Sequence, residues 1–279
     1  MKFALLHHAD QKTIDDMYNL YQPVFLLSTG RSGSKFLAEL LNHSPNLAAF
    51  HEPQPTLQYF SHYAYIHQQE KDTLTKMIDV ARMELILDVF IKDKIYVESN
   101  QCLTFFAPML AQLFKKAKFV HIVRHPGDFI RSAVCKGWHK NDSIWESGRV
   151  KLADQQQWQT MDHIQRLAWL WATTHQYIEH FKHSIDPKRH AFFKMEDLVS
   201  DIQQVQDLLN FIGGQDIPVE QIKEIQHNPI NELIIHPNEP PNIKKNLTFP
   251  HYTQWGLHTK EKVQPFVREL LLLYQYPPL

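Results

Sequence analysis

The segment from residue 24 to residue 41 constrains the fold more than any other part of the chain. It contains the apolar run VFLLST, the polar stretch GRSGS and the run FLAELL. VFLLST is rich in strand-forming residues, whereas FLAELL has the apolar spacing of a helix. The segment therefore predicts a strand, a glycine-bearing loop and a helix, in that order.

The same alternation continues along the chain. Apolar runs predict further strands at 47–50, 94–100, 118–124 and 190–196, and helical periodicity predicts helices at 73–90, 105–116, 129–138, 159–183, 199–214 and 259–274. Strands that alternate with helices imply right-handed crossovers and a parallel sheet covered on both faces. We therefore expect an α/β fold, a single domain over residues 1–279 with a parallel β-sheet flanked by helices.

The composition of the chain fits one large domain and argues against a nucleic-acid-binding protein and a zinc protein. With 279 residues and 43% hydrophobic content, the chain is long enough to bury the core of one large domain. Its 29 lysines and arginines are balanced by 30 acidic residues, so no net basic field favours a nucleic-acid partner. The 18 histidines are scattered without the regular spacing of a zinc site, and no metal is expected.

Two further features bear on location. The two cysteines, Cys102 and Cys135, lie in no CxxC pattern and make no disulfide framework, which favours a reducing, cytoplasmic compartment. No apolar run is as long as the roughly 18 residues that a transmembrane helix needs, so no transmembrane segment is predicted. The sequence does not predict an oligomeric state.

The glycine-bearing loop is a candidate anion site. A loop between a strand and a helix points main-chain N–H groups and the positive end of the helix dipole at one place. Gly30 and Gly33 permit close approach of the backbone, and four neighbouring side chains add donors: Arg31, Ser32, Ser34 and Lys35. A simple tight turn with solvated Arg31 and Lys35 is the alternative.

A nucleoside-triphosphate enzyme is the first competing class. Its loop has a hydroxyl residue after the lysine to bind magnesium, whereas Phe36 follows Lys35 here. The buried strand KFVHIVR ends in Arg124 rather than in an aspartate, and an arginine attracts a second anion and repels a cation. A kinase that uses ATP and magnesium, and a non-catalytic nucleotide-binding protein, remain the alternatives.

About four separated segments carry a family resemblance, and two of them contain its phosphate motifs. STGRSGSKFLAELLNHSPNLAAFHEP resembles the 5'-phosphosulfate loop of sulfotransferases, especially carbohydrate 6-O-sulfotransferases, and KFVHIVRHPGDFIRSA resembles their 3'-phosphate motif. The resemblance implies a P-loop nucleotide-kinase-like sulfotransferase fold. It also implies 3'-phosphoadenosine 5'-phosphosulfate (PAPS) as the sulfuryl donor, without a metal.

Carried over by position, the resemblance assigns roles to individual residues. The residues that would bind the 3'-phosphate are Arg124 and Ser132. Those that would bind the 5'-phosphosulfate are the loop residues Gly30, Arg31, Ser32, Gly33, Ser34 and Lys35. Glu52 lies where many members keep the catalytic base, and Lys35 would assist the leaving group. His51 is an alternative base, because imidazole titrates near neutrality.

The chain departs from the family pattern at one strand end. Several sulfotransferases have a lysine in the strand-end segment that aligns with VESN, where this chain has Glu98, Ser99 and Asn100. In the loop PNIKKN, Lys244 and Lys245 either contact the 3'-phosphate or are solvated.

The resemblance implies an acceptor that bears a hydroxyl, a carbohydrate or a small metabolite. Aromatic side chains either offer stacking faces to a sugar or belong to the core. They are Trp138, Trp145, Trp158, Trp169, Trp171, Tyr59, Tyr63 and Tyr65.

Overall fold

The computed structural model describes residues 9–139, 149–227 and 249–279. Its centre is a five-stranded sheet of order β2-β3-β1-β4-β5, and all four strand pairs are parallel. The strands are β1 (Val24–Leu27), β2 (Leu47–His51), β3 (Ile95–Ser99), β4 (Lys118–Val123) and β5 (His190–Lys194). The predicted parallel α/β sheet is confirmed, and each predicted strand is present within a few residues of its expected bounds.

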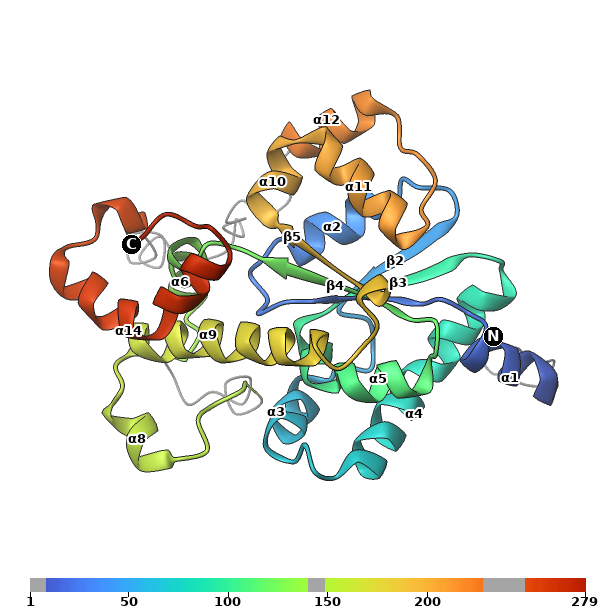
Figure 1. The fold of residues 1–279 in the computed structure, drawn as a ribbon, viewed down its shortest axis with the longest axis horizontal. Helices are drawn as coiled ribbons and strands as arrows, with labels where there is room; N and C mark the ends of the chain where they lie inside the picture. The colour runs from blue at the N-terminus through green and yellow to red at the C-terminus, as the bar shows by residue number, and fades with distance from the viewer. Residues whose placement is uncertain (1–8, 140–148, 228–248) are drawn as a thin grey trace, which may run out of the picture.

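Helices cover both faces of this sheet (Figure 1). Those described are α1 (Gln11–Asn19), α2 (Ser34–Leu41), α3 (Gln58–Ile66), α4 (Lys71–Ile91), α5 (Ala107–Leu113), α6 (Pro126–Cys135), α8 (Gln155–Thr160), α9 (His163–Lys182), α10 (Met195–Ser200), α11 (Ile202–Ile212), α12 (Val219–His227) and α14 (Leu257–Leu273). Short 3-10 turns lie at Gln101–Phe106, Pro187–Arg189 and Tyr252–Gln254.

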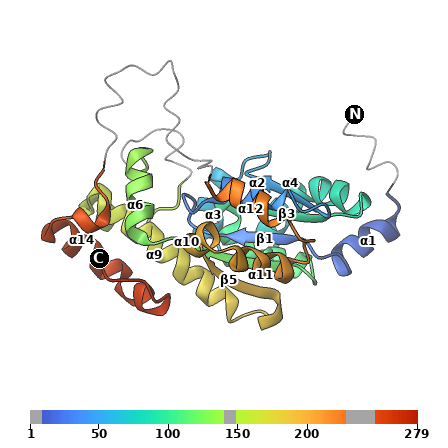
Figure 2. The same cartoon turned by 90° about the horizontal axis from the view of Figure 1, so that it is seen from above.

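Alternating strand residues divide the core into two layers. Val24 and Leu26 of β1 pack with α2, α11 and α12, whereas Phe25 and Leu27 pack into the larger layer that includes α4, α5 and α9. This division follows from the two-residue period of a strand, which sends successive side chains to opposite faces. Figure 2 shows the molecule from above, from the side of the sheet on which α2, α11 and α12 lie.

Several helix boundaries differ from the sequence prediction. The helix expected at 159–183 is α9, which begins only at His163, because Asp162 forms a capping box with Gln165; the short helix α8 precedes it. The helix expected at 199–214 is α11, which begins at Ile202, after the short helix α10. Helices α1, α3 and α12 were not predicted. The predicted loop at 236–246 lies outside the described residues.

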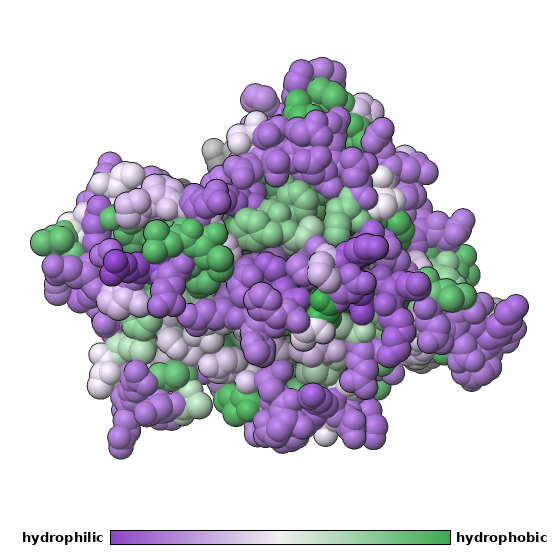
Figure 3. Space-filling view, in the orientation of Figure 1, coloured by the Kyte–Doolittle hydropathy of each residue, from purple (hydrophilic) through white to green (hydrophobic). Residues whose placement is uncertain are grey.

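The candidate stacking residues are mostly core. Trp158, Trp169 and Trp171 are all less than a tenth exposed, and Trp171 is fully buried. The face shown in Figure 3 is mainly hydrophilic with scattered hydrophobic patches. The exposed apolar residues of the described chain include Leu272 and Leu273 of α14. Within the described residues, no helix is long and apolar enough to cross a membrane.

Candidate active site

The carboxyl ends of β1 and β4 lie side by side. Leu27 at the end of β1 is in register with His121 of β4, and the two polar loops that follow these strands meet beyond this edge. On its other side β1 pairs with β3, so the chain order reverses at β1. Such a switch point is where ligands bind in open α/β sheets.

The glycine loop leaves the amino end of α2 open. Gly33 is the N-cap residue, with φ of 76°, and no side chain caps the helix. The first N–H groups of α2 therefore have no capping partner there, which is the arrangement that binds an anion at a helix start. A β-carbon on Gly33 would lie 2.3 Å from Cε of Met195, so the close packing here favours glycine.

The two predicted phosphate motifs contact each other directly. Nε of Arg31 donates to Oγ of Ser132 at 3.0 Å, and Nη1 of Arg124 donates to the main-chain oxygen of Arg31 at 3.1 Å. Trp171 in turn donates from Nε1 to the main-chain oxygen of Arg124 at 3.0 Å, so α9 supports the end of β4. The tertiary fold brings together residues that lie about a hundred positions apart in the chain.

The region is electropositive. Burial lowers the pKa of Arg31, and the nearby charge of Arg124 lowers this pKa further, while Glu52 partly opposes the effect. Among the described residues, neither arginine forms an ion pair with a carboxylate. Two arginines without an acidic partner beside an uncapped helix start are a donor set that suits a polyanion.

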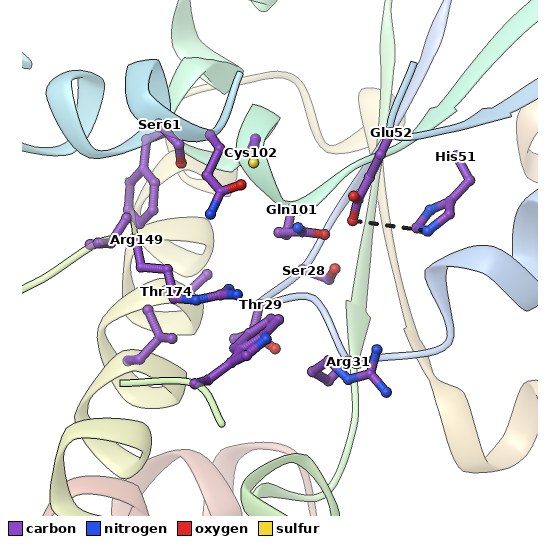
Figure 4. A pocket seen from close by; sticks show the side chains of 15 residues that line it. Ser28, Thr29, Arg31, His51, Glu52, Ser61, Gln101, Cys102, Arg149 and Thr174 are labelled. Atoms are coloured by element: carbon purple, nitrogen blue, oxygen red, sulfur yellow. Dashed lines mark ion pairs between the residues drawn. The ribbon is translucent and has the colours of Figure 1, made fainter. Parts of the chain in front are cut away.

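A cavity of about 280 Å³ opens beside this loop (Figure 4). Ser28, Thr29 and Arg31 line it from the loop, and His51 and Glu52 line it from the end of β2. Other lining residues are Gln58, Ser61, Gln101, Cys102, Phe105, Trp138, Arg149, Val150, Leu170 and Thr174. The sequence did not single out most of these, because they come from five separate segments.

Glu52 occupies a constrained position at the cavity wall. Its φ is 45°, a left-handed conformation that is unfavourable for a residue with a side chain, and its N–H donates to the main-chain oxygen of Ser99 at 3.4 Å. Nε2 of His51 lies 3.9 Å from Oε1 of Glu52, and Nδ1 of His51 lies 3.2 Å from the same Ser99 oxygen. Both candidate bases, Glu52 and His51, line the cavity.

Lys35 lies elsewhere. Its side chain is about half exposed on α2, with Nζ 3.7 Å from Oε1 of Glu39, and it does not line the cavity. The residues at the end of β3, Glu98, Ser99 and Asn100, are all buried, and none of them lines the cavity. Ser32 and Ser34 are buried in the loop, and Lys244, Lys245 and Trp145 lie outside the described residues.

The described residues contain no cluster of three or more acidic, histidine or cysteine side chains that could hold a metal ion. The fold and this site together define a class: an α/β protein with a glycine-loop anion site at the switch point of a parallel sheet. In enzymes this arrangement holds the phosphate groups of a nucleotide.

Comparisons with known proteins give the family. Residues 23–217 match the family model described as the sulfotransferase family, and the match includes both phosphate motifs and Glu52. The chain therefore belongs to the sulfotransferase family and is a PAPS-dependent transferase. No curated protein sequence matches it.

Solved structures show the same fold. The sulfotransferase domain from the curacin biosynthetic pathway is 19% identical, with a TM-score of 0.54 over 94% of this chain and 100% of that chain. Sulfotransferase STF9 from Mycobacterium avium is 12% identical, with a TM-score of 0.53 over 99% of this chain and 82% of that chain. At these identities the likeness concerns the fold.

Proposed function

We propose that this enzyme transfers the sulfuryl group of PAPS to a hydroxyl of a carbohydrate or small-metabolite acceptor, with Glu52 as the general base. The observation that carries the proposal is the contact between the two anion motifs, Arg31 with Ser132 and Arg124 with the Arg31 main chain. A nucleotide with phosphates at both its 3' and 5' positions matches two adjacent groups of donors.

The donor site is built from two parts. The loop N–H groups of Gly30, Ser32, Gly33 and Ser34, with the Arg31 guanidinium, would hold the 5'-phosphosulfate, and Arg124 with Ser132 would hold the 3'-phosphate. The donor, when bound, supplies the activated sulfuryl group. Arg31 lines the cavity whereas Lys35 is exposed, so Arg31 is the nearer cation for charge that develops on the leaving group, and Lys35 adds a longer-range contribution.

The base lies on the other side of the cavity. In this proposal Glu52 accepts the proton of the acceptor hydroxyl, and His51 is the alternative acceptor of that proton. Glu52 belongs to the short segment after β2, and the backbone bond to Ser99 holds it beside β3. The strained backbone at Glu52 supports a functional role, since left-handed non-glycine residues concentrate at functional sites.

The cavity lining supports a polar acceptor with apolar faces, as sugars have. Phe105, Trp138 and Leu170 offer apolar surface, whereas Ser61 and Gln101 offer hydrogen-bonding groups.

The proposal includes two further statements about the chain. Residues 1–279 form a single domain, and the protein is located in the cytoplasm. The support for this location is that the two cysteines lie in no CxxC pattern and are too few for a disulfide framework.

A thermal-shift panel followed by a transfer assay tests the function. Adenosine 3',5'-bisphosphate should raise the melting temperature far more than ATP with magnesium does, because at equal concentration a ligand that binds the folded state more tightly stabilises it more. If ATP with magnesium raises the melting temperature and adenosine 3',5'-bisphosphate does not, the result would favour a kinase. Binding of the bisphosphate without transfer of labelled sulfate to any member of a broad library of sugars, phenols and alcohols would favour a non-catalytic binding protein.

A further inference from the structure

A buried ion pair lies behind the Glu52 turn, and the proposed reaction does not use it directly. Arg82 of α4 is 1% exposed, and Glu98 of β3 is 0% exposed. Nε of Arg82 donates to both carboxylate oxygens of Glu98, at 3.0 and 2.7 Å. Removing two charges from water is unfavourable unless the geometry is good and further hydrogen bonds satisfy both groups.

Glu98 is fully occupied by donors from its own surroundings. Besides Arg82, it accepts from Oη of Tyr96 at 2.6 Å and from Nδ2 of Asn100 at 2.9 Å. These bonds leave no oxygen directed into the cavity, which agrees with its absence from the cavity lining. Glu98 therefore neutralises Arg82 and fixes the plane of its guanidinium.

The rest of the guanidinium reaches the turn that carries the proposed base. Nη1 of Arg82 donates to the main-chain oxygen of Pro55 at 3.2 Å, and Nη2 lies 3.5 Å from the main-chain oxygen of Pro53. Pro53 directly follows Glu52, whose own backbone is left-handed. One buried side chain thus contacts the turn at two carbonyl groups just after Glu52.

We propose that Arg82, held in place by Glu98, is a positioning residue that clamps the Pro53–Pro55 turn and so fixes the Glu52 carboxylate at the cavity wall. A guanidinium suits this role, because its rigid, planar group of donors points toward the carboxylate and both carbonyls at once, which an ammonium cannot do. The inference rests on the proposed function of Glu52 as the base. It assigns a role to Glu98, which belongs to the strand-end segment in which several sulfotransferases have a lysine.

The test replaces the pair without leaving a buried charge. Arg82→Met combined with Glu98→Gln removes both charges, and the new amide keeps groups that can bond to Tyr96 and Asn100. Replacing both partners of a buried pair is tolerated far better than removing one. Since misplacement of a reacting group by about 1 Å can cost on the order of a hundredfold in rate, kcat should fall by at least about tenfold. The dissociation constant of adenosine 3',5'-bisphosphate should change by less than about twofold, because none of its proposed contacts is altered.

Hydrogen exchange gives a readout that does not depend on activity. In the Arg82→Met/Glu98→Gln protein, the amides of Glu52, Gln54 and Thr56 should exchange faster, while those of α2 should be unchanged. Arg82→Lys keeps the positive charge opposite Glu98 but loses the planar group of donors, so it should show the same faster exchange in the turn. This variant replaces the double variant in the test if the double variant does not fold. Ile86→Ala, a buried change on the same helix away from the turn, should lower stability without changing kcat.

A double-mutant cycle separates positioning from general damage. In a Glu52→Gln background the Arg82 and Glu98 changes should cause no further loss of kcat, because there is no carboxylate left to position. An equal loss in both backgrounds, or full kcat in the variant that retains Glu52, would overturn the inference. Full activity of Glu52→Gln would instead remove the base assignment, and the exchange data would still report whether Arg82 holds the turn.

Discussion

Arg31 and Ser132 are joined by a hydrogen bond of 3.0 Å, although they are 101 positions apart in the chain. The bond connects the loop after β1 to helix α6 after β4. It places the two anion motifs in one continuous donor surface.

Arg124→Ala should weaken binding of adenosine 3',5'-bisphosphate far more than binding of 5'-AMP. Arg124 is assigned to the 3'-phosphate, which 5'-AMP lacks, and a lost charge-assisted hydrogen bond costs about 1.5–3 kcal/mol, or roughly 10- to 100-fold in affinity. Calorimetric titration of both nucleotides measures the difference. Arg131→Ala, which changes an exposed arginine of the helix α6 that follows Arg124, is the matched control. Equal losses for the two nucleotides would contradict the 3'-phosphate assignment.

Glu52→Gln should keep nucleotide binding and lose turnover by roughly a hundredfold or more, the usual contribution of a general base. Steady-state kinetics with a productive acceptor, together with nucleotide titration, provide the check. His51→Gln is the companion variant, because both side chains line the cavity. A larger loss in the His51 variant would transfer the role of base to the imidazole.

Arg31→Gln should reduce kcat more than Lys35→Gln does. The Arg31 guanidinium lines the cavity, whereas Lys35 is half exposed and lies 3.7 Å from Glu39, where solvent screens its charge. We expect a loss of at least about a hundredfold for Arg31→Gln and less than about tenfold for Lys35→Gln. The reverse order would show that Lys35 moves to the leaving group when the donor binds.

Gly33→Ala should impair nucleotide binding as well as stability. Its φ is 76°, and the added methyl group would lie 2.3 Å from Met195, so the loop must shift. Gly137→Ala is a close control, because Gly137 has a φ of 69° with nothing within 4 Å of an added β-carbon. The control should lose only about 1 kcal/mol for the left-handed backbone. Melting temperatures and bisphosphate titrations of both variants would separate backbone strain from damage to the anion site. Equal losses of stability and of affinity in the two variants would contradict the argument that contact with Met195 requires glycine at position 33.

Acid should destabilise the fold below about pH 6.5. Burial lowers the pKa of His139 to about 3, and it also lowers the pKa of His121 and of His175. The unfolded chain then binds protons that the folded chain does not. The stability is complete above pH 6.5 and falls as the pH drops toward the folded pKa, by up to about 1.4 kcal/mol per pH unit for each histidine.

Urea unfolding at several pH values between 7 and 4.5 measures this dependence. His139→Gln should make the slope shallower by about one proton. His258→Gln, an exposed position, should leave it unchanged. A slope that His139→Gln does not alter would contradict the contribution of this histidine.

Local patterns were sufficient to predict the strands and the glycine loop. The β1 run is apolar because both of its faces are buried, and Gly33 is required where the chain turns left-handed into α2. The order of the strands was not predicted, since it depends on which hydrophobic faces pack together after long crossovers. The capping box at Asp162 was present in the sequence but was outweighed by the apolar periodicity on both sides of it.

The sequence by itself determined the alternation of strands and helices and the glycine loop, because each depends on neighbouring residues. The predicted 3'-phosphate motif and the candidate base came from the family resemblance. Only the tertiary structure decided which of these residues share a cavity. Lys35 and Arg31 are four positions apart, yet the helix directs one to solvent and the loop directs the other to the cavity. Glu98 and Arg82 form a buried pair because α4 packs beside β3, and burial of a charge is a property of the whole fold rather than of a local pattern.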